Sequence, residues 1–190
     1  MLNKKPVFVN GFSRGGTNIL MNILLSHPGT AMPSGELHRV IRGGAHGDRK
    51  KDKRRKSIFY AYPTSVILGK PFFDFKNLEK RRLPNKITAS YIDYILYAEK
   101  QRATQHPGHN RYIREQERFS KKDLKDARLV CKNIDGLVQL TDTFQSIYPD
   151  ASFVCVVRNG LALLESNLRR GANLEDFSRH YYKIATKILS

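Results

Sequence analysis

The sequence lacks the features of a secreted or membrane-bound protein. It has two cysteines, Cys131 and Cys155, too few for a disulfide framework or a cysteine-based zinc site. It has no run of about 18 apolar residues that could cross a bilayer. Asn10, Gly11 and Arg14 interrupt the apolar residues near the start too early for a signal peptide. We therefore expect a protein of the reducing cytoplasm.

Acidic residues are also scarce. The chain has 17 Asp and Glu against 34 Lys and Arg, which gives a formal charge of +17. Such a surface attracts nucleic acid, phosphate- or sulfate-bearing substrates, or an acidic membrane face. The 190 residues are 40% hydrophobic with 10 Phe and 9 Tyr, enough for a packed core. We expect a single domain over residues 1–190, truncated at its C-terminus because the last helical pattern ends without a stop signal.

The first segment has the order strand, glycine-rich turn, helix. Residues 6–10 are a short apolar strand, and residues 11–16 are rich in glycine. Residues 17–26 are predicted to form a helix that is apolar almost all round, which is typical of an interior helix. Many α/β nucleotide-binding folds begin in this order.

Regular patterns return near the C-terminus. A strand over 128–132, a helix over 136–148 and a strand over 152–157 fit one right-handed βαβ crossover. The last of these is apolar without alternation, which predicts a parallel strand covered on both faces. These segments predict an α/β fold of three layers, P-loop-like, with a central parallel sheet flanked by helices. Further elements are expected at residues 31–36 (a strand) and at 86–102, 112–127, 160–170 and 174–189 (helices).

The turn that begins at Gly11 reads GFSRGGTN and has the glycine spacing of a phosphate-binding loop. Its backbone N–H groups and the N-terminus of the next helix would form a cradle for an anion. Thr17 and Asn18 stand where the ATP-binding pattern has Lys and then Ser or Thr. A cation lies inside the loop instead, at Arg14. The loop favours a phosphate-containing donor bound without magnesium and argues against a standard kinase or ATPase.

Two more cations follow predicted strands. Arg158 comes directly after one strand, and Lys132 ends another. The carboxyl ends of parallel strands meet at one edge of a sheet, so Arg14, Lys132 and Arg158 should lie close together. Ser166 lies about two turns along the helix after Arg158. A guanidinium and a hydroxyl placed in this way can hold one phosphate together.

These motifs resemble those of sulfotransferases that use 3′-phosphoadenosine 5′-phosphosulfate (PAPS). GFSRGGTN resembles the family's 5′-phosphosulfate loop, and VVRNG through Ser166 is similar to its 3′-phosphate motif. Residues 14–40, including SGE at 34–36, resemble the tyrosylprotein sulfotransferase branch in particular. VCKN at 130–133 resembles the lysine-bearing strand of the family, with Lys and Asn in the opposite order to the tyrosylprotein enzymes. The resemblance covers residues 6–40 and 128–170.

The resemblance implies how the donor PAPS would be held. Arg158 and Ser166 would bind its 3′-phosphate. The phosphosulfate end would lie on the loop and the following helix, on Arg14, Gly15, Gly16, Thr17 and Asn18. No metal is implied.

The resemblance also implies sulfuryl transfer to a hydroxyl acceptor, either a protein tyrosine or a carbohydrate. Arg14 and Lys132 would stabilise charge on the leaving phosphate. Glu36 would be the general base that takes the acceptor's proton. His38, two residues on, is the rival base.

Residues 42–56 are predicted to form a basic loop insertion. They hold eight basic and two acidic residues, a charge of +6. The stretch is either a solvated loop or a docking surface for an acidic peptide or an anionic glycan. The alternative function is a non-catalytic polyanion- or nucleic-acid-binding module that uses the run Arg49–Lys56. We do not expect nucleic acid, because no aromatic residues interrupt the run for base stacking.

His106 and His109 lie in a Pro-Gly turn and are not expected to bind a metal.

Overall fold

Four parallel strands form a sheet in the computed structural model, which describes residues 2, 4–33, 37, 86–102 and 120–190. The order across the sheet is β2-β3-β1-β4. The strands are β1 (Val7–Gly11), β2 (Thr30–Ala31), β3 (Arg128–Ile134) and β4 (Ser152–Val156). The helices are α1 (Thr17–Leu25), α5 (Lys86–Arg102), α6 (Lys121–Asp126), η4 (Asp135–Leu140), α7 (Thr141–Ile147), α8 (Gly160–Leu168) and α9 (Leu174–Leu189).

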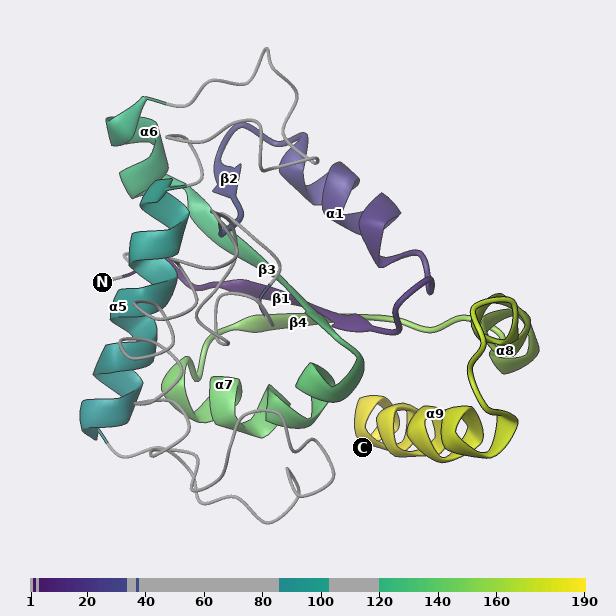
Figure 1. The fold of residues 1–190 in the computed structure, drawn as a ribbon. Coiled ribbons are helices and arrows are strands. Elements are labelled where there is room, and N and C mark those ends of the chain that lie inside the picture. The colour runs from purple at the N-terminus through teal and green to yellow at the C-terminus, as the bar shows by residue number, and fades with distance from the viewer. Residues whose placement is uncertain (1, 3, 34–36, 38–85, 103–119) are drawn as a thin grey trace, which may run out of the picture.

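Helices cover both faces of this sheet (Figure 1). Alternate residues of β1 point to opposite faces, as strand geometry requires. Val7 and Val9 pack with Met21 of α1, whereas Phe8 packs with α5 and α7. The predicted α/β fold with a central parallel sheet flanked by helices is confirmed.

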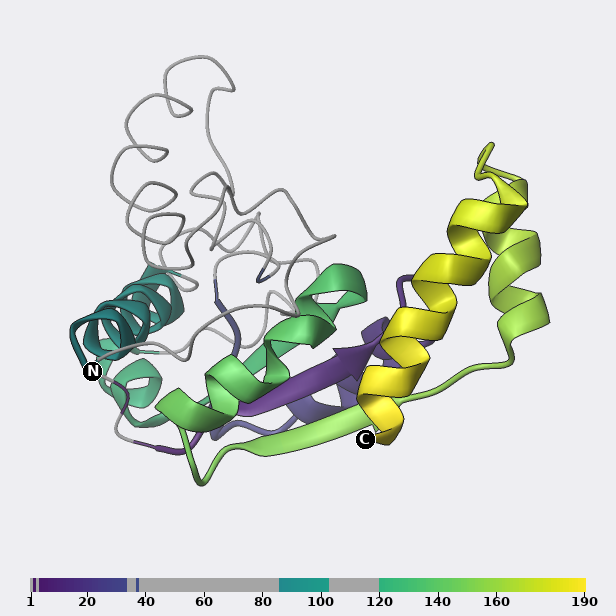
Figure 2. The same cartoon turned by 90° about the horizontal axis from the view of Figure 1, so that it is seen from below.

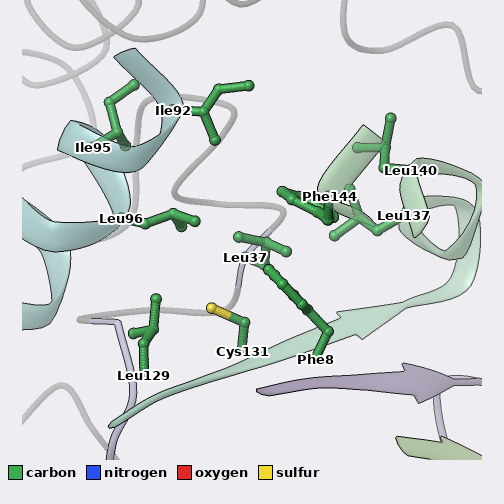
Figure 3. Close-up of a cluster of buried hydrophobic side chains, with 10 residues drawn as sticks. All are labelled: Phe8, Leu37, Ile92, Ile95, Leu96, Leu129, Cys131, Leu137, Leu140 and Phe144. Carbon is green, nitrogen blue, oxygen red and sulfur yellow. The ribbon is translucent and has the colours of Figure 1, made fainter. Parts of the chain in front are cut away.

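The larger part of the core lies between the sheet and the helices α5 and α7. Phe8 is fully buried, and its ring stacks on Phe144 of α7 with centroids 4.6 Å apart. On its other side Phe8 stacks on Phe153 of β4 at 5.2 Å. Figure 3 shows Leu129, Cys131 and Phe8 rising from the strands toward the apolar side chains of the helices. Burial among these groups raises the pKa of the Cys131 thiol, whereas Cys155 of β4 is exposed.

Helices α8 and α9 lie side by side beyond the ends of the strands (Figure 2). Leu163 of α8 and Ile184 of α9 pack with Phe12, the first residue after β1, and Val138 of η4. Asn159 caps α8, because its side chain accepts hydrogen bonds from the N–H groups of Leu161 and Ala162. The helix pair therefore forms a wall at the carboxyl edge of the sheet.

Two burial predictions are wrong. The strand at 152–157 was expected to be covered on both faces, but β4 is the edge strand of the described sheet, and Ser152, Val154 and Cys155 are exposed. The helix α1 was expected to be interior, but Ile19 and Ile23 are 68% and 62% exposed. One stripe of α1 contacts the sheet, so the opposite stripe faces away from it.

Several element boundaries also differ from the prediction. The strand expected at 31–36 is the two-residue β2, and residues 34–36 lie outside the described residues. The helix expected at 136–148 begins as the 3₁₀-helix η4 and continues as α7. Of the helix expected at 112–127, the described part contains α6, which begins after a capping box formed by Ser120 and Asp123. Among the helices described, none has the length and apolar composition that a membrane crossing requires.

Candidate functional site

A pocket of about 1190 Å³ opens at the carboxyl ends of β1, β3 and β4. The loop after β1 and the start of α1 line one side, and the residues after β3 line another. The helices α8 and α9 complete the described walls. In open parallel sheets, this edge is where ligands bind.

The loop after β1 has a conformation that its sequence explains. Gly16 has a φ of 96°, a left-handed value that glycine adopts without strain. A Cβ on Gly11 would lie 2.9 Å from the Val156 carbonyl oxygen, so β1 needs glycine where it meets β4. Helix α1 begins after Gly16 without a side-chain cap, and Thr17, Asn18 and Ile19 line the pocket. The positive end of the helix therefore points at the pocket.

The structure brings Arg14, Lys132 and Arg158 to this one pocket. Lys132 is 5% exposed, and its ammonium donates a hydrogen bond to Asn18 Oδ1 at 2.6 Å. Arg158 Nη1 donates to the backbone oxygen of Arg14 at 2.8 Å. Arg14 follows β1 and Arg158 follows β4, as predicted, whereas Lys132 lies two residues before the end of β3, which was expected to end at Lys132 and runs to Ile134.

Of the other residues predicted to bind the donor, four line the pocket and Gly15 does not. Ser166 lines the pocket from α8, and Gly16, Thr17 and Asn18 line it from the loop and α1. Gly15 is not among the lining residues, and its N–H donates to the Phe12 oxygen at 2.9 Å. The Gly15 N–H is therefore used inside the turn, so the cradle depends on the residues after it.

Several predicted functional residues lie outside the described residues. These are Glu36, His38, the basic loop 42–56 with its run Arg49–Lys56, His106 and His109. Their roles stay predictions from the sequence.

Sequence reasoning missed five charged or titratable residues of the pocket: Asp135, Glu165, Arg169, Arg170 and His180. Asp135 Oδ1 accepts a hydrogen bond from Ser13 N at 2.8 Å, which joins the end of β3 to the loop. Arg169 forms an ion pair with Glu165 one turn earlier on α8. The pair of arginines at the end of the helix predicted over 160–170 was a usable signal for Arg169 and Arg170. His180 carries no local signal, because its place in the pocket depends on how α9 packs.

The pocket's chemistry fits a multiply charged anion. Its walls carry four arginines, one lysine and the N-terminus of α1 against two carboxylates. Over the part of the chain that the structure describes, no three or more His, Cys, Asp and Glu side chains are grouped so as to hold a metal ion. Arg14, Lys132 and Arg158 all lie at the loop side of this pocket, because Lys132 bonds Asn18 and Arg158 bonds the Arg14 carbonyl.

One comparison with known proteins gives a match. A model of the sulfotransferase family matches residues 6–189. The match includes the loop after β1, the end of β3 and the α8–α9 pair, so it spans every wall of the pocket. No curated protein and no solved structure matches the chain.

Proposed function

The chain belongs to the sulfotransferase family, and from this premise we propose that it transfers a sulfuryl group from PAPS to a hydroxyl acceptor. The observation that carries the proposal is the gathering of Arg14, Lys132 and Arg158 in one pocket at the carboxyl ends of β1, β3 and β4. PAPS carries several negative charges, on its 3′-phosphate and its 5′-phosphosulfate, and these three cations would neutralise part of them.

The 5′ end of the donor is assigned to the loop and α1. The N–H groups at the start of α1, with the Thr17 and Asn18 side chains, would bind the 5′-phosphate. The loop lacks the lysine of ATP-binding loops. Lys132 of β3 brings an ammonium to the start of α1 instead, because it donates a hydrogen bond to Asn18 Oδ1. Asn18 therefore orients the Lys132 ammonium at the N-terminus of the helix.

The 3′-phosphate is assigned to Arg158 and Ser166. A guanidinium has several N–H donors in a fixed fork, so Arg158 can bond the Arg14 carbonyl and still present donors to a phosphate. Ser166 lines the same pocket from α8 and can donate its hydroxyl. This pair would separate PAPS from nucleotides that lack a 3′-phosphate.

The transfer itself would be an in-line displacement at sulfur. PAPS supplies an activated sulfuryl group whose leaving group is adenosine 3′,5′-bisphosphate (PAP). Arg14 and Lys132 stabilise the charge that develops on the bridging oxygen as the sulfur–oxygen bond breaks. Glu36 accepts the proton of the acceptor hydroxyl as the new sulfur–oxygen bond forms.

The acceptor is assigned from the sequence. The resemblance of residues 14–40 to the tyrosylprotein branch favours a tyrosine in an acidic peptide, and an anionic carbohydrate is the second class. The basic loop 42–56 would attract either one. The charge of +17 also favours a second candidate function, a non-catalytic polyanion-binding module that uses Arg49–Lys56.

A binding titration tests the donor. PAP, 5′-AMP and ATP are titrated calorimetrically into the chain with EDTA present, and again with magnesium. PAP should bind at least about tenfold more tightly than 5′-AMP, a difference of about 1.4 kcal/mol, because the 3′-phosphate adds a charge-assisted contact. Magnesium should change neither affinity.

Two variants and one competitor complete the experiment. Arg158→Gln should remove the preference for PAP over 5′-AMP. Arg179→Gln, an exposed arginine of α9 that pairs with Glu175, should keep it. Equal affinities in the wild type, or an absolute need for magnesium, would overturn the donor assignment. Tight binding of a duplex DNA oligonucleotide at physiological salt without PAP binding would favour the polyanion module.

A further inference from the structure

Two residues of the pocket have strained backbones. Among the described residues, Arg14 and Asp135 are the non-glycine residues with positive φ, at 67° and 55°. Both line the same pocket, one after β1 and the other after β3. A left-handed backbone is unfavourable for an arginine, so it persists where surrounding contacts hold it.

Two long-range hydrogen bonds hold the loop at Arg14, one at the peptide N–H of the preceding residue and one at the carbonyl of Arg14 itself. Before it, the Ser13 N–H donates to Asp135 Oδ1 at 2.8 Å. After it, the Arg14 carbonyl accepts from Arg158 Nη1 at 2.8 Å. The partners come from the ends of β3 and β4, the two strands that flank β1. The loop is therefore fixed at Arg14 by residues that follow both neighbouring strands.

The Asp135 carboxylate lines a pocket that is otherwise rich in cations. Its negative charge opposes the binding of phosphate or sulfate nearby. Its backbone at 55° suits aspartate and asparagine, whose short polar side chains tolerate the left-handed region. The hydrogen bond that Asp135 accepts from the Ser13 N–H joins the end of β3 to the loop.

We propose that Asp135 is a positioning residue for sulfuryl transfer, which holds the loop so that Arg14 faces the donor. This inference rests on the function proposed above. The loop requires residue 135 to place an acceptor oxygen at the Ser13 N–H and to tolerate a positive φ. The negative charge is not required. Asparagine should therefore replace Asp135, and glycine, which tolerates the backbone but has no acceptor, should not.

Three variants separate these requirements. Asp135→Asn keeps the acceptor and removes the charge. Asp135→Gly keeps the backbone and removes the acceptor. Asp135→Glu keeps the charge and moves the acceptor by one methylene. Asp150→Gly is the control, because Asp150 is an exposed aspartate paired with Lys5 outside the pocket.

The first measurement is hydrogen exchange of the Ser13 amide by NMR in the unliganded protein. Exchange should be at least about tenfold faster in Asp135→Gly and Asp135→Glu, and close to the wild-type rate in Asp135→Asn and Asp150→Gly. The second is the calorimetric affinity for PAP. It should fall at least about tenfold in the Gly and Glu variants and be unchanged or tighter in the Asn variant. Thermal unfolding of each variant shows that the fold is intact, and the Glu variant carries the test if the Gly variant does not fold.

Unchanged Ser13 exchange in both Asp135→Gly and Asp135→Glu would overturn the proposal. So would a loss of PAP affinity in Asp135→Asn as large as that in Asp135→Gly, because the charge would then matter more than the acceptor. If the wild type itself fails to bind PAP, the donor assignment falls. The exchange measurement, which needs no ligand, still decides whether Asp135 holds the loop.

Discussion

Replacing Lys132 with methionine should separate binding of the donor from its activation. Lys132 is 5% exposed, and its ammonium donates a hydrogen bond to Asn18 Oδ1 at the start of α1. Water screens such a charge less than it screens a surface lysine. Lys132→Met keeps the apolar length of the side chain and removes the charge, so the packing of the stem between β3 and α1 should survive.

The size of the effect follows from when the charge is needed. Lys132 is assigned to the oxygen that gains negative charge as PAP leaves, so its contribution is largest in the transition state. Removing one such donor typically costs about 10²–10³ in kcat, or about 2.7–4 kcal/mol. The leaving oxygen is fully charged in PAP and only partly charged in PAPS. The variant should therefore lose affinity for PAP, by about tenfold or more, while KM for PAPS changes less.

The assay follows radioactive sulfate from PAPS to a tyrosine-containing acidic peptide and to an anionic polysaccharide, with PAP as product inhibitor. Lys187→Met is the matched control, since Lys187 is a lysine of α9 that pairs with Asp142 outside the pocket. It should leave kcat and PAP inhibition unchanged. If Lys132→Met raises KM for PAPS at constant kcat, Lys132 only binds the donor and the reasoning fails.

Three further results are expected. Glu36→Gln should lower kcat by about 10²–10⁴ and leave PAP affinity unchanged, because it removes the base and touches no donor group. Wild-type turnover by this variant would assign the general base to His38 instead. Replacing the basic residues of Arg49–Lys56 with glutamine should raise KM for an acidic acceptor at low salt and leave PAP affinity unchanged. An acceptor KM independent of salt in the wild type would count against a docking role. Phe8→Ala should lower the free energy of unfolding by about 3–5 kcal/mol in a urea titration, because the ring is fully buried against Phe144. A loss below about 1 kcal/mol would mean that the core refills the space.

The sequence was informative where local pattern and topology agree. The first strand, its glycine-rich turn and the next helix are one continuous local signal, and β3 and β4 each contain a short apolar run typical of a parallel strand. Once the strands are known, the rule that their carboxyl ends share an edge places Arg14, Lys132 and Arg158 together. The roles of these cations still stay predictions.

The contacts that the sequence did not predict depend on tertiary structure. The strand β3 was expected over residues 128–132, yet it continues to Ile134. Asn133 is fully buried, and its amide donates to Asn10 Oδ1 at 2.7 Å, so a polar pair between two strands lies inside the sheet. Asp135, the residue after β3, was not among the predicted site residues. The exposure of β4 was likewise missed, because an apolar run gives no sign of whether its strand lies at the centre of a sheet or at its edge.

The contrast between the two thiols has a practical use. Cys131 is closed off in the core with a raised pKa, and Cys155 is exposed on the edge strand, three residues before Arg158. A maleimide fluorophore added to the native protein should therefore attach at one position, because the thiolate is the reactive form. The dye would sit on the strand that leads into the pocket, so the proposed nucleotide binding could be followed by fluorescence without engineering a cysteine. The same unmodified chain could also be tethered to a surface through a defined point.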